Sequence, residues 1–192
     1  MLRNSKSGYG LIAILFHWSM ALLMFGVFGL GLYMHELPQF EERTFALYQL
    51  HKSFGFTILA LVVLRLMWRF ANPAPRLPGA MPLWEKAAAH GAHAVLYALM
   101  FAIPLSGWLM VSASPWGIPT VLFDTIPVPH LPVPGFLGAK EAAESVMKEV
   151  HELLAWAMIV LAAFHAAAAI KHHLIARDDT LRRMLSPRSA RA

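Results

Sequence analysis

The chain has 192 residues, of which 58% are hydrophobic and only 14% charged, with a formal net charge of +5. Soluble domains are about 45–50% apolar and about 25% charged, so this composition argues against a soluble enzyme, a disordered segment and a nucleic-acid-binding module. Ten histidines accompany a complete absence of cysteine. Disulfide bonds, cysteine-ligated zinc, iron–sulfur clusters and covalently attached c-type haem are therefore excluded.

Long apolar stretches predict two membrane helices in the first half of the chain. No charge occurs between Lys6 and Glu36, so we predict one helix over residues 10–33, longer than the roughly 20 residues that a bilayer requires. A second helix is predicted over residues 47–70. It ends before the proline-rich run that begins at Asn72, because a residue that precedes proline disfavours the helical conformation.

Two more helices are predicted in the second half of the chain, over residues 84–112 and 148–173. Between them, residues 113–147 contain six prolines and are interpreted as an outer loop with a short helix at 138–147. A basic tail, residues 174–192, follows the last helix.

The distribution of charge predicts the orientation of the helices. Twelve of the 16 Lys and Arg residues fall on one side of this arrangement, and eight of the 11 acidic residues fall on the other. Because Lys and Arg concentrate in cytoplasmic loops, we expect both termini in the cytoplasm. The predicted fold is an all-α, up-down, four-helix transmembrane bundle that forms one domain over residues 1–192. Its partner is membrane lipid, and the basic charge requires no nucleic acid.

The spacing of two histidines on the fourth predicted helix indicates two cofactor sites. His151 and His165 are 14 residues apart, which is four helical turns less about 40°, with a rise of about 21 Å. Both rings therefore face one side of the helix, one near each membrane surface. Two haems stacked across a bilayer need this spacing, whereas the ligands of one zinc ion must converge within a few ångströms.

The same offset of 14 residues on the other helices leads to residues that suit a macrocycle. It leads from His17 to Gly31, from His51 to Arg65 and from His93 to Gly107. A glycine lets a flat macrocycle approach the backbone, and an arginine can bind a propionate through two hydrogen bonds. We therefore expect Gly31, Arg65 and Gly107 to contact cofactor. A competing explanation for the two glycines is ordinary close packing of helices. For Arg65 it is a position at the membrane interface, which the guanidinium reaches along its apolar stem.

The depth of each histidine predicts the ligand pairs. The first helix runs outward and the second inward, so His17 is level with His165, and His51 is level with His151. Each pair would hold one iron between two neutral imidazoles, as in a b-type haem. His93 competes with His17 for the inner site, because it begins its helix at the inner depth. A single intramembrane histidine can also serve only to bond a neighbouring helix.

His172 follows His165 by seven residues and lies within about 20° of its face. We expect it at the cytoplasmic interface, where a neutral imidazole could bond a quinone carbonyl and pass a proton. Its neighbour Lys171 supports a simpler interpretation, a solvated helix end.

Several segments in this order resemble the bacterial cytochrome b561 family, and the resemblance covers residues 8–185. They are Phe16–Trp18, His51–Gly55, Arg65–Pro75, His90–His93, His151–Glu152 and His165–His173. The resemblance implies a four-helix membrane protein of the bacterial inner membrane, with two non-covalent haem b groups, that exchanges electrons with the quinone pool. It implies His17, His51, His151 and His165 as ligands, and His93 as an alternative ligand or a neighbour of the quinone.

The chain is similar in particular to small, stand-alone family members that include a superoxide oxidase. This similarity implies that superoxide, or another small periplasmic donor, is oxidised while ubiquinone is reduced. Lys52, beside His51, and Arg43 are candidates for attracting the superoxide anion. One alternative is a haem-bearing anchor subunit that passes electrons from a partner dehydrogenase or hydrogenase to quinone. A second is a colourless proton or metal carrier that uses the histidines without haem.

Overall fold

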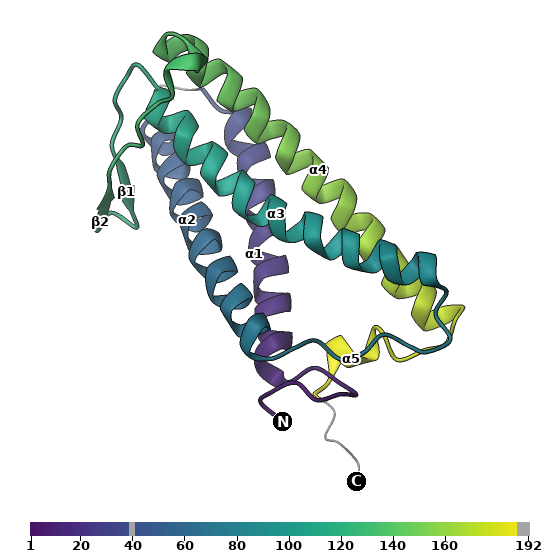
Figure 1. Ribbon diagram of the computed structural model, residues 1–192. Helices are drawn as coiled ribbons and strands as arrows, with labels where there is room; N and C mark the ends of the chain where they lie inside the picture. Colours follow the sequence, from purple (N-terminus) through teal and green to yellow (C-terminus); the bar gives the residue numbers. More distant parts are fainter. Residues whose placement is uncertain (39–40, 188–192) are drawn as a thin grey trace. The chain divides into compact units, whose positions relative to one another are not determined.

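The structure is a computed structural model that describes residues 1–38 and 41–187. Within these residues four long helices dominate, as Figure 1 shows: α1 (Leu11–His35), α2 (Glu42–Ala71), α3 (Leu83–Ala113) and α4 (Lys140–Leu174). All four are long and apolar enough to cross a membrane. The predicted all-α class with four membrane helices is therefore confirmed.

Most of the apolar side chains on these helices have no protein neighbour to cover them. In the most apolar window of each helix, at most 17% of the residues are buried. Leu22 on α1 is 72% exposed and Phe164 on α4 is 70% exposed. Contiguous apolar surface of this extent is unfavourable in water, so lipid is the medium that these helices fit.

Two helices begin earlier than the sequence predicts. Helix α2 begins at Glu42 rather than at 47, and α4 begins at Lys140 rather than at 148. The short helix predicted at 138–147 is the first part of α4. The prediction was wrong here because it followed the charge-free stretch that a bilayer needs. Ala, Glu and Met are strong helix formers, and no proline lies between Pro134 and the end of α4, so this helix extends beyond that stretch.

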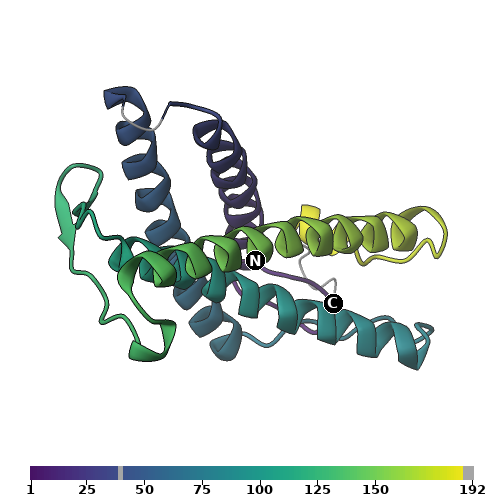
Figure 2. The ribbon, with the colours of Figure 1, turned by 90° about the horizontal axis from the view of Figure 1, so that it is seen from above.

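The loop predicted at 113–147 is therefore shorter, and part of it is a β-hairpin. Strands β1 (Thr120–Leu122) and β2 (Ile126–Val128) pair antiparallel, with Leu122 opposite Ile126. A 3-10 helix, η1 (Gly135–Leu137), follows them. Figures 1 and 2 show the hairpin after the end of α3. The prediction missed it because each strand has only three residues, too few for a clear alternating pattern.

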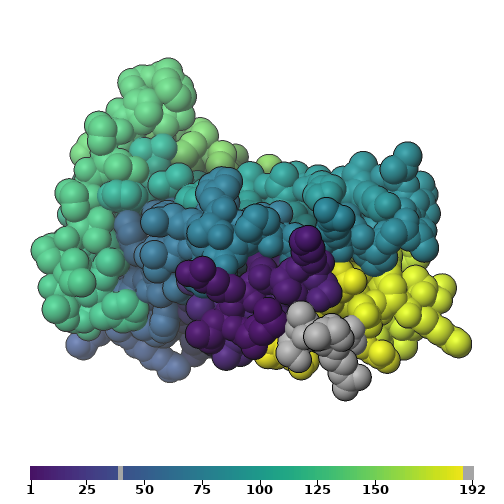
Figure 3. All heavy atoms as spheres, turned by 60° about the horizontal axis from the view of Figure 1, so that its bottom comes forward, coloured from purple at the N-terminus to yellow at the C-terminus, as the bar shows by residue number. Residues whose placement is uncertain are grey.

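The predicted basic tail also contains structure. After α4 ends at Leu174, the chain turns back into a short helix, α5 (Arg182–Leu185). The indole of Trp18 donates a hydrogen bond to the carbonyl of Met184 (2.7 Å). Figure 3 shows the first residues of the chain (purple) beside this C-terminal segment (yellow). The last part of the predicted tail, residues 188–192, lies outside the described residues.

The chain divides into two compact units, and each unit contains part of every long helix. The first, which we call the terminal unit, contains His17, His93 and His165. The second, the hairpin unit, contains His51, His151, β1 and β2. The terminal unit consists of Met1–Ala21, Leu61–Ala98 and the chain from Met158 onward. The hairpin unit consists of Leu22–Ala60 and Leu99–Ala157.

Candidate functional site

In the hairpin unit, α2 and α4 bring two half-buried imidazole rings together. The ring centroids of His51 and His151 are 6.2 Å apart, and the ring planes form an angle of 74°. Two imidazoles on opposite sides of one metal ion have centroids about 6 Å apart, because a metal–nitrogen bond is about 2 Å long and the nitrogen lies about 1 Å from its ring centroid. The observed separation therefore fits an ion held between the two rings.

Hydrogen bonds fix the protonation of the His151 ring. Its Nδ1 lies 2.9 Å from the carbonyl oxygen of Ile103 and 3.1 Å from the hydroxyl of Ser106. A carbonyl oxygen can only accept, so Nδ1 carries the proton and Nε2 keeps a free lone pair. Metal-binding histidines are commonly oriented in this way. The Nδ1 of His51 is buried and has no hydrogen-bond partner among the described residues.

The two glycines predicted as cofactor contacts lie against these histidine rings. A Cβ atom built on Gly31 would lie 3.2 Å from Cε1 of His51, and one built on Gly107 would lie 3.0 Å from Cε1 of His151. A methyl group at either position would therefore require the imidazole to shift by a few tenths of an ångström. The glycines of α1 and α3 make room for the histidines of α2 and α4.

Three histidines meet in the terminal unit. The ring centroids of His17 and His165 are 6.1 Å apart, and those of His93 and His165 are 5.3 Å apart. Both residues that the sequence offers as partners of His165 are therefore its neighbours. The first separation matches that of the pair in the hairpin unit, while the second is shorter than an ion between two imidazoles requires.

Arg65 occupies the space beside His17. Its Nη2 donates a hydrogen bond to Nδ1 of His17 (3.2 Å), and its guanidinium lies 5.4 Å from the ring centroid of Tyr97. Arginine can only donate, so Nδ1 of His17 is the acceptor, and a neutral ring then carries its proton on Nε2. An ion at Nε2 of His17 therefore requires that Arg65 release Nδ1. The released guanidinium would be free to bind an anionic group.

His172, the expected quinone contact, is buried between two carboxylates. Its Nδ1 lies 2.7 Å from Oδ2 of Asp178, and its Nε2 lies 3.3 Å from Oε2 of Glu85. Lys171 binds the same Glu85 at 2.6 Å. Neither ring nitrogen is therefore free to bond a quinone carbonyl in this arrangement.

The Asp178 carboxylate of this cluster lies beyond the end of α4. Partial burial raises its pKa, but hydrogen bonds from Thr180 and His172 outweigh that effect, and the pKa is held below its ordinary value. The carboxylate therefore stays ionised through the neutral range and holds His172 in place.

The two basic residues predicted to attract an anion are both engaged by other groups. The ammonium of Lys52 donates a hydrogen bond to the carbonyl of Pro119 (3.3 Å), and its side chain is half-buried. Arg43 donates to the hydroxyl of Tyr33 (2.8 Å). Lys52 follows His51 directly in α2, so it is the positive charge nearer to the histidine pair along the chain.

Sequence reasoning identified the histidines and glycines but missed the groups that orient them. Ile103, Ser106 and Tyr97 carried no signal, because a carbonyl, a hydroxyl and a phenol are common in any helix. Glu85 could have been found, since it is the one acidic residue between Glu42 and Asp124.

The ligand set fits haem better than a metal held by protein alone. Within residues 1–38 and 41–187, no group of three or more His, Asp or Glu side chains is placed to hold a metal ion. Each histidine pair would supply two ligands to an iron, and a haem macrocycle would supply the others. The glycines beside the rings and the fixed tautomer of His151 agree with that arrangement.

Comparison with known proteins gives the family. The family model of prokaryotic cytochrome b561 matches residues 8–187. The chain belongs to the prokaryotic cytochrome b561 family. It is 37% identical over 188 residues to cytochrome b561 homolog 2 of Escherichia coli, covering 97% of this chain and 96% of that one. It is 30% identical over 182 residues to the probable superoxide oxidase CybB of Yersinia pestis, covering 92% and 95%.

Membership of the cytochrome b561 family confirms the resemblance seen in the sequence. The protein is a multi-pass bacterial membrane protein of electron transfer, and the family implies that it binds haem b. The absence of cysteine agrees with this, because b-type haem is held without covalent bonds to the chain.

The contacts of the glycines yield a first prediction. We expect Gly107→Ala and Gly31→Ala to lower the haem content of the purified protein and its melting temperature, because the added methyl group displaces a histidine ring. Gly29→Ala on α1 and Gly91→Ala on α3 are matched controls, since a Cβ there meets nothing within 4 Å. They should leave haem content unchanged and stabilise the helix by up to about 1 kcal/mol. Equal haem content in all four variants would contradict this role of the glycines.

Proposed function

We propose that the protein holds two haem b groups, one between His51 and His151 and one between His17 and His165. In this proposal it carries electrons from superoxide on the periplasmic side of the inner membrane to ubiquinone. The observation that carries the proposal is the similar ring separation of the two pairs, 6.2 and 6.1 Å. When bound, haem supplies one-electron redox chemistry, which matches a donor that gives a single electron.

His93 is proposed as a neighbour of the inner haem rather than as a ligand. Its ring lies 5.3 Å from that of His165, which leaves too little room for an iron between them. His17 would serve as the ligand once Arg65 released its Nδ1. The guanidinium of Arg65 would then be available to the haem propionates, whose carboxylates suit its paired N–H donors.

Electrons and protons balance in the proposed reaction. Two superoxide anions each give one electron and leave as dioxygen, and one ubiquinone takes up two electrons and two protons. Lys52 supplies positive charge beside His51, which favours the approach of a small anion. The similarity to a protein named probable superoxide oxidase supports this donor.

The quinone end is proposed to lie in the terminal unit, near His165 and His172. Because Glu85 and Asp178 hold both nitrogens of His172, we assign His172 a role in passing protons toward the quinone rather than in bonding its carbonyl. Carboxylates and imidazole together form a path for protons. The excess of Lys and Arg on this side, with both termini, supports a cytoplasmic location for it.

The assignment of the inner ligands leads to a second prediction. We expect His17→Ala to lose one of two haems per chain, and His93→Ala to keep both, because only His17 has the separation of a ligand from His165. A pyridine haemochrome assay on the purified variants gives the count. His90→Ala, an exposed residue of the same helix as His93, is the control and should keep both haems. Loss of a haem from His93→Ala alone would reverse the assignment.

The donor is tested by a third prediction. We expect the purified protein in vesicles, without any partner, to reduce ubiquinone when superoxide is generated enzymatically. Lys52→Gln should lower kcat/KM for superoxide several-fold and weaken its dependence on salt, because the attracting charge is lost. Arg43→Gln is the matched control, and haem content should be the same in both variants.

The wild-type protein could contain both haems, reducible by dithionite, and still take no electrons from superoxide. That result would exclude superoxide as the donor. The anchor role, with electrons delivered by a partner dehydrogenase or hydrogenase, would then be the better account. A protein with no haem absorption at all would support the colourless carrier instead.

A further inference from the structure

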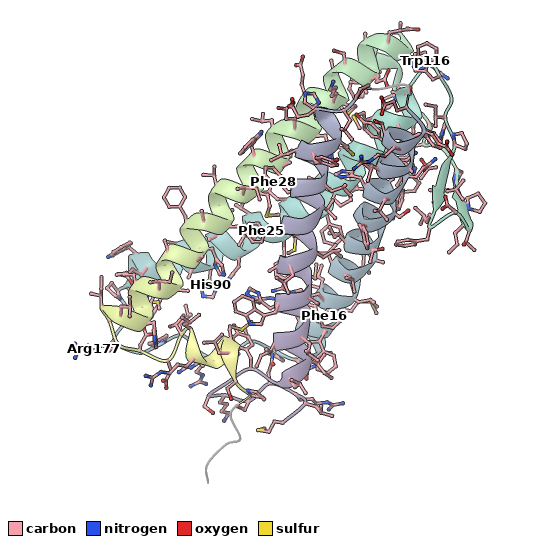
Figure 4. The ribbon with its side chains drawn as sticks, turned by 180° about the vertical axis from the view of Figure 1, so that it is seen from behind. Phe16, Phe25, Phe28, His90, Trp116 and Arg177 are labelled. Atoms are coloured by element: carbon pink, nitrogen blue, oxygen red, sulfur yellow. The ribbon has the colours of Figure 1, made fainter. Side chains whose placement is uncertain are left out.

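The segment between α3 and α4 folds back against the helices instead of extending away from them. We call residues 114–131 the folded-back segment. Its hairpin lies along the part of α2 that carries His51, and the ring of Phe123 packs on Phe54 with centroids 5.5 Å apart. Figure 1 shows β1 and β2 beside α2, and Figure 4 labels Trp116 at the start of the segment. All of these residues belong to the hairpin unit.

Helix side chains satisfy the backbone of this segment. Gln49 and Lys52 both donate to the carbonyl of Pro119, at 2.9 and 3.3 Å. The indole of Trp108 donates to the carbonyl of Pro129 (3.0 Å). Two serine hydroxyls accept from backbone N–H groups, Ser53 from Phe123 and Ser112 from Leu131, both at 2.9 Å.

Proline removes further polar groups from the same region. The folded-back segment contains four prolines, and none of them has a backbone N–H. A loop in water does not need helix side chains or prolines to deal with its backbone polar groups, because water bonds any that are free. In the apolar part of a membrane, irregular backbone is tolerated only when its polar groups have partners in the protein. Side chains of α2 and α3 form five hydrogen bonds of this kind, to four backbone groups of the folded-back segment.

The exposed side chains of the folded-back segment are mostly apolar. Trp116 is 74% exposed, Phe123 51% and Ile126 58%. Asp124 is the one charged residue between Lys86 and Lys140. Phe123 takes a left-handed conformation, with φ of 48°, which a large side chain seldom adopts. This strained turn places an aromatic ring at the tip, beside Phe54.

The contacts also give the depth of the segment in the membrane. On α4 the first group of charged residues ends at Glu152, next to His151, and a charge-free stretch runs from Leu153 to Ile170. Gly107 on α3 touches His151, and the following residue, Trp108, binds Pro129. The folded-back segment therefore reaches the level at which the apolar core of the bilayer begins. A single carboxylate at its tip is compatible with this boundary but not with the centre of the bilayer.

We propose that the folded-back segment is embedded in the lipid interface on the outer face of the membrane, with Phe123 and Ile126 against lipid acyl chains. Lipid is the occupant because the exposed side chains of the segment are mostly apolar, the helices beside it expose apolar side chains, and four of its backbone groups are bonded by helix side chains. The segment anchors the hairpin unit in the bilayer and covers the side of α2 next to His51.

The natural absence of cysteine allows a direct test. Single variants Phe123→Cys and Ile126→Cys are labelled with a nitroxide in the haem-loaded protein, in vesicles of phosphatidylcholine and phosphatidylglycerol. Oxygen, which concentrates in lipid, and a water-soluble nickel chelate then compete to relax the label. Leu22→Cys on α1, a highly exposed apolar site, is the lipid control, and Glu141→Cys in the first turn of α4 is the water control.

We expect both hairpin labels to be relaxed more by oxygen than by nickel, with a ratio several-fold above that of the Glu141 label and below that of the Leu22 label, which lies in the middle of α1. Relaxation by nickel equal to that of the Glu141 label would place the segment in water and overturn the proposal. Protection from both reagents would mean that protein covers the segment, a second copy or a partner, and would overturn it as well. Unchanged haem absorption confirms that each labelled protein is folded.

Discussion

An imidazole ring inside an apolar helix has lost most of its hydration, so its two nitrogens need partners within the protein or a bound group. Five histidines of this chain are in that position, and four of them form two pairs whose ring centroids are 6.1 and 6.2 Å apart. Other features follow from holding these rings at that separation. Gly31 and Gly107 leave room for the rings of His51 and His151, and Ile103 and Ser106 hold one nitrogen of His151 so that the other can bind metal.

The two sites differ in how ready they are to bind. His151 already presents a free nitrogen, because its other nitrogen bonds the carbonyl of Ile103. His17 has its Nδ1 bonded to Arg65, so in our account the site between His17 and His165 would have to rearrange to bind haem. The displaced guanidinium of Arg65 would then be available to neutralise the propionates. The same residue thus satisfies the polar ring of His17 in the absence of cofactor and the anionic groups of the cofactor once it is bound.

Much of this architecture was predictable from the sequence, because it depends on periodic patterns. Charge-free stretches identified the four helices, and the spacing of 14 residues on α4 identified which residues face the same side. The partners of those residues were not predictable. His151 bonds the backbone carbonyl of Ile103, and His172 bonds Asp178 and Glu85. Groups of these kinds are common in any helix, so nothing in the sequence marks them as partners. The folded-back segment was interpreted as an ordinary loop, because the helix side chains that bond its backbone lie up to 70 residues away along the chain.

Iron positions in the haem-loaded protein would test the central claim most directly. X-ray diffraction data collected at the iron absorption edge locate each iron by anomalous scattering, independently of any assumption about the ligands. Our account predicts two iron peaks per chain, one between His17 and His165 and one between His51 and His151, with the ring of His93 beside the first but not bound to it. A single peak, or a peak whose nearest nitrogens belong to His93 and His165, would contradict the account.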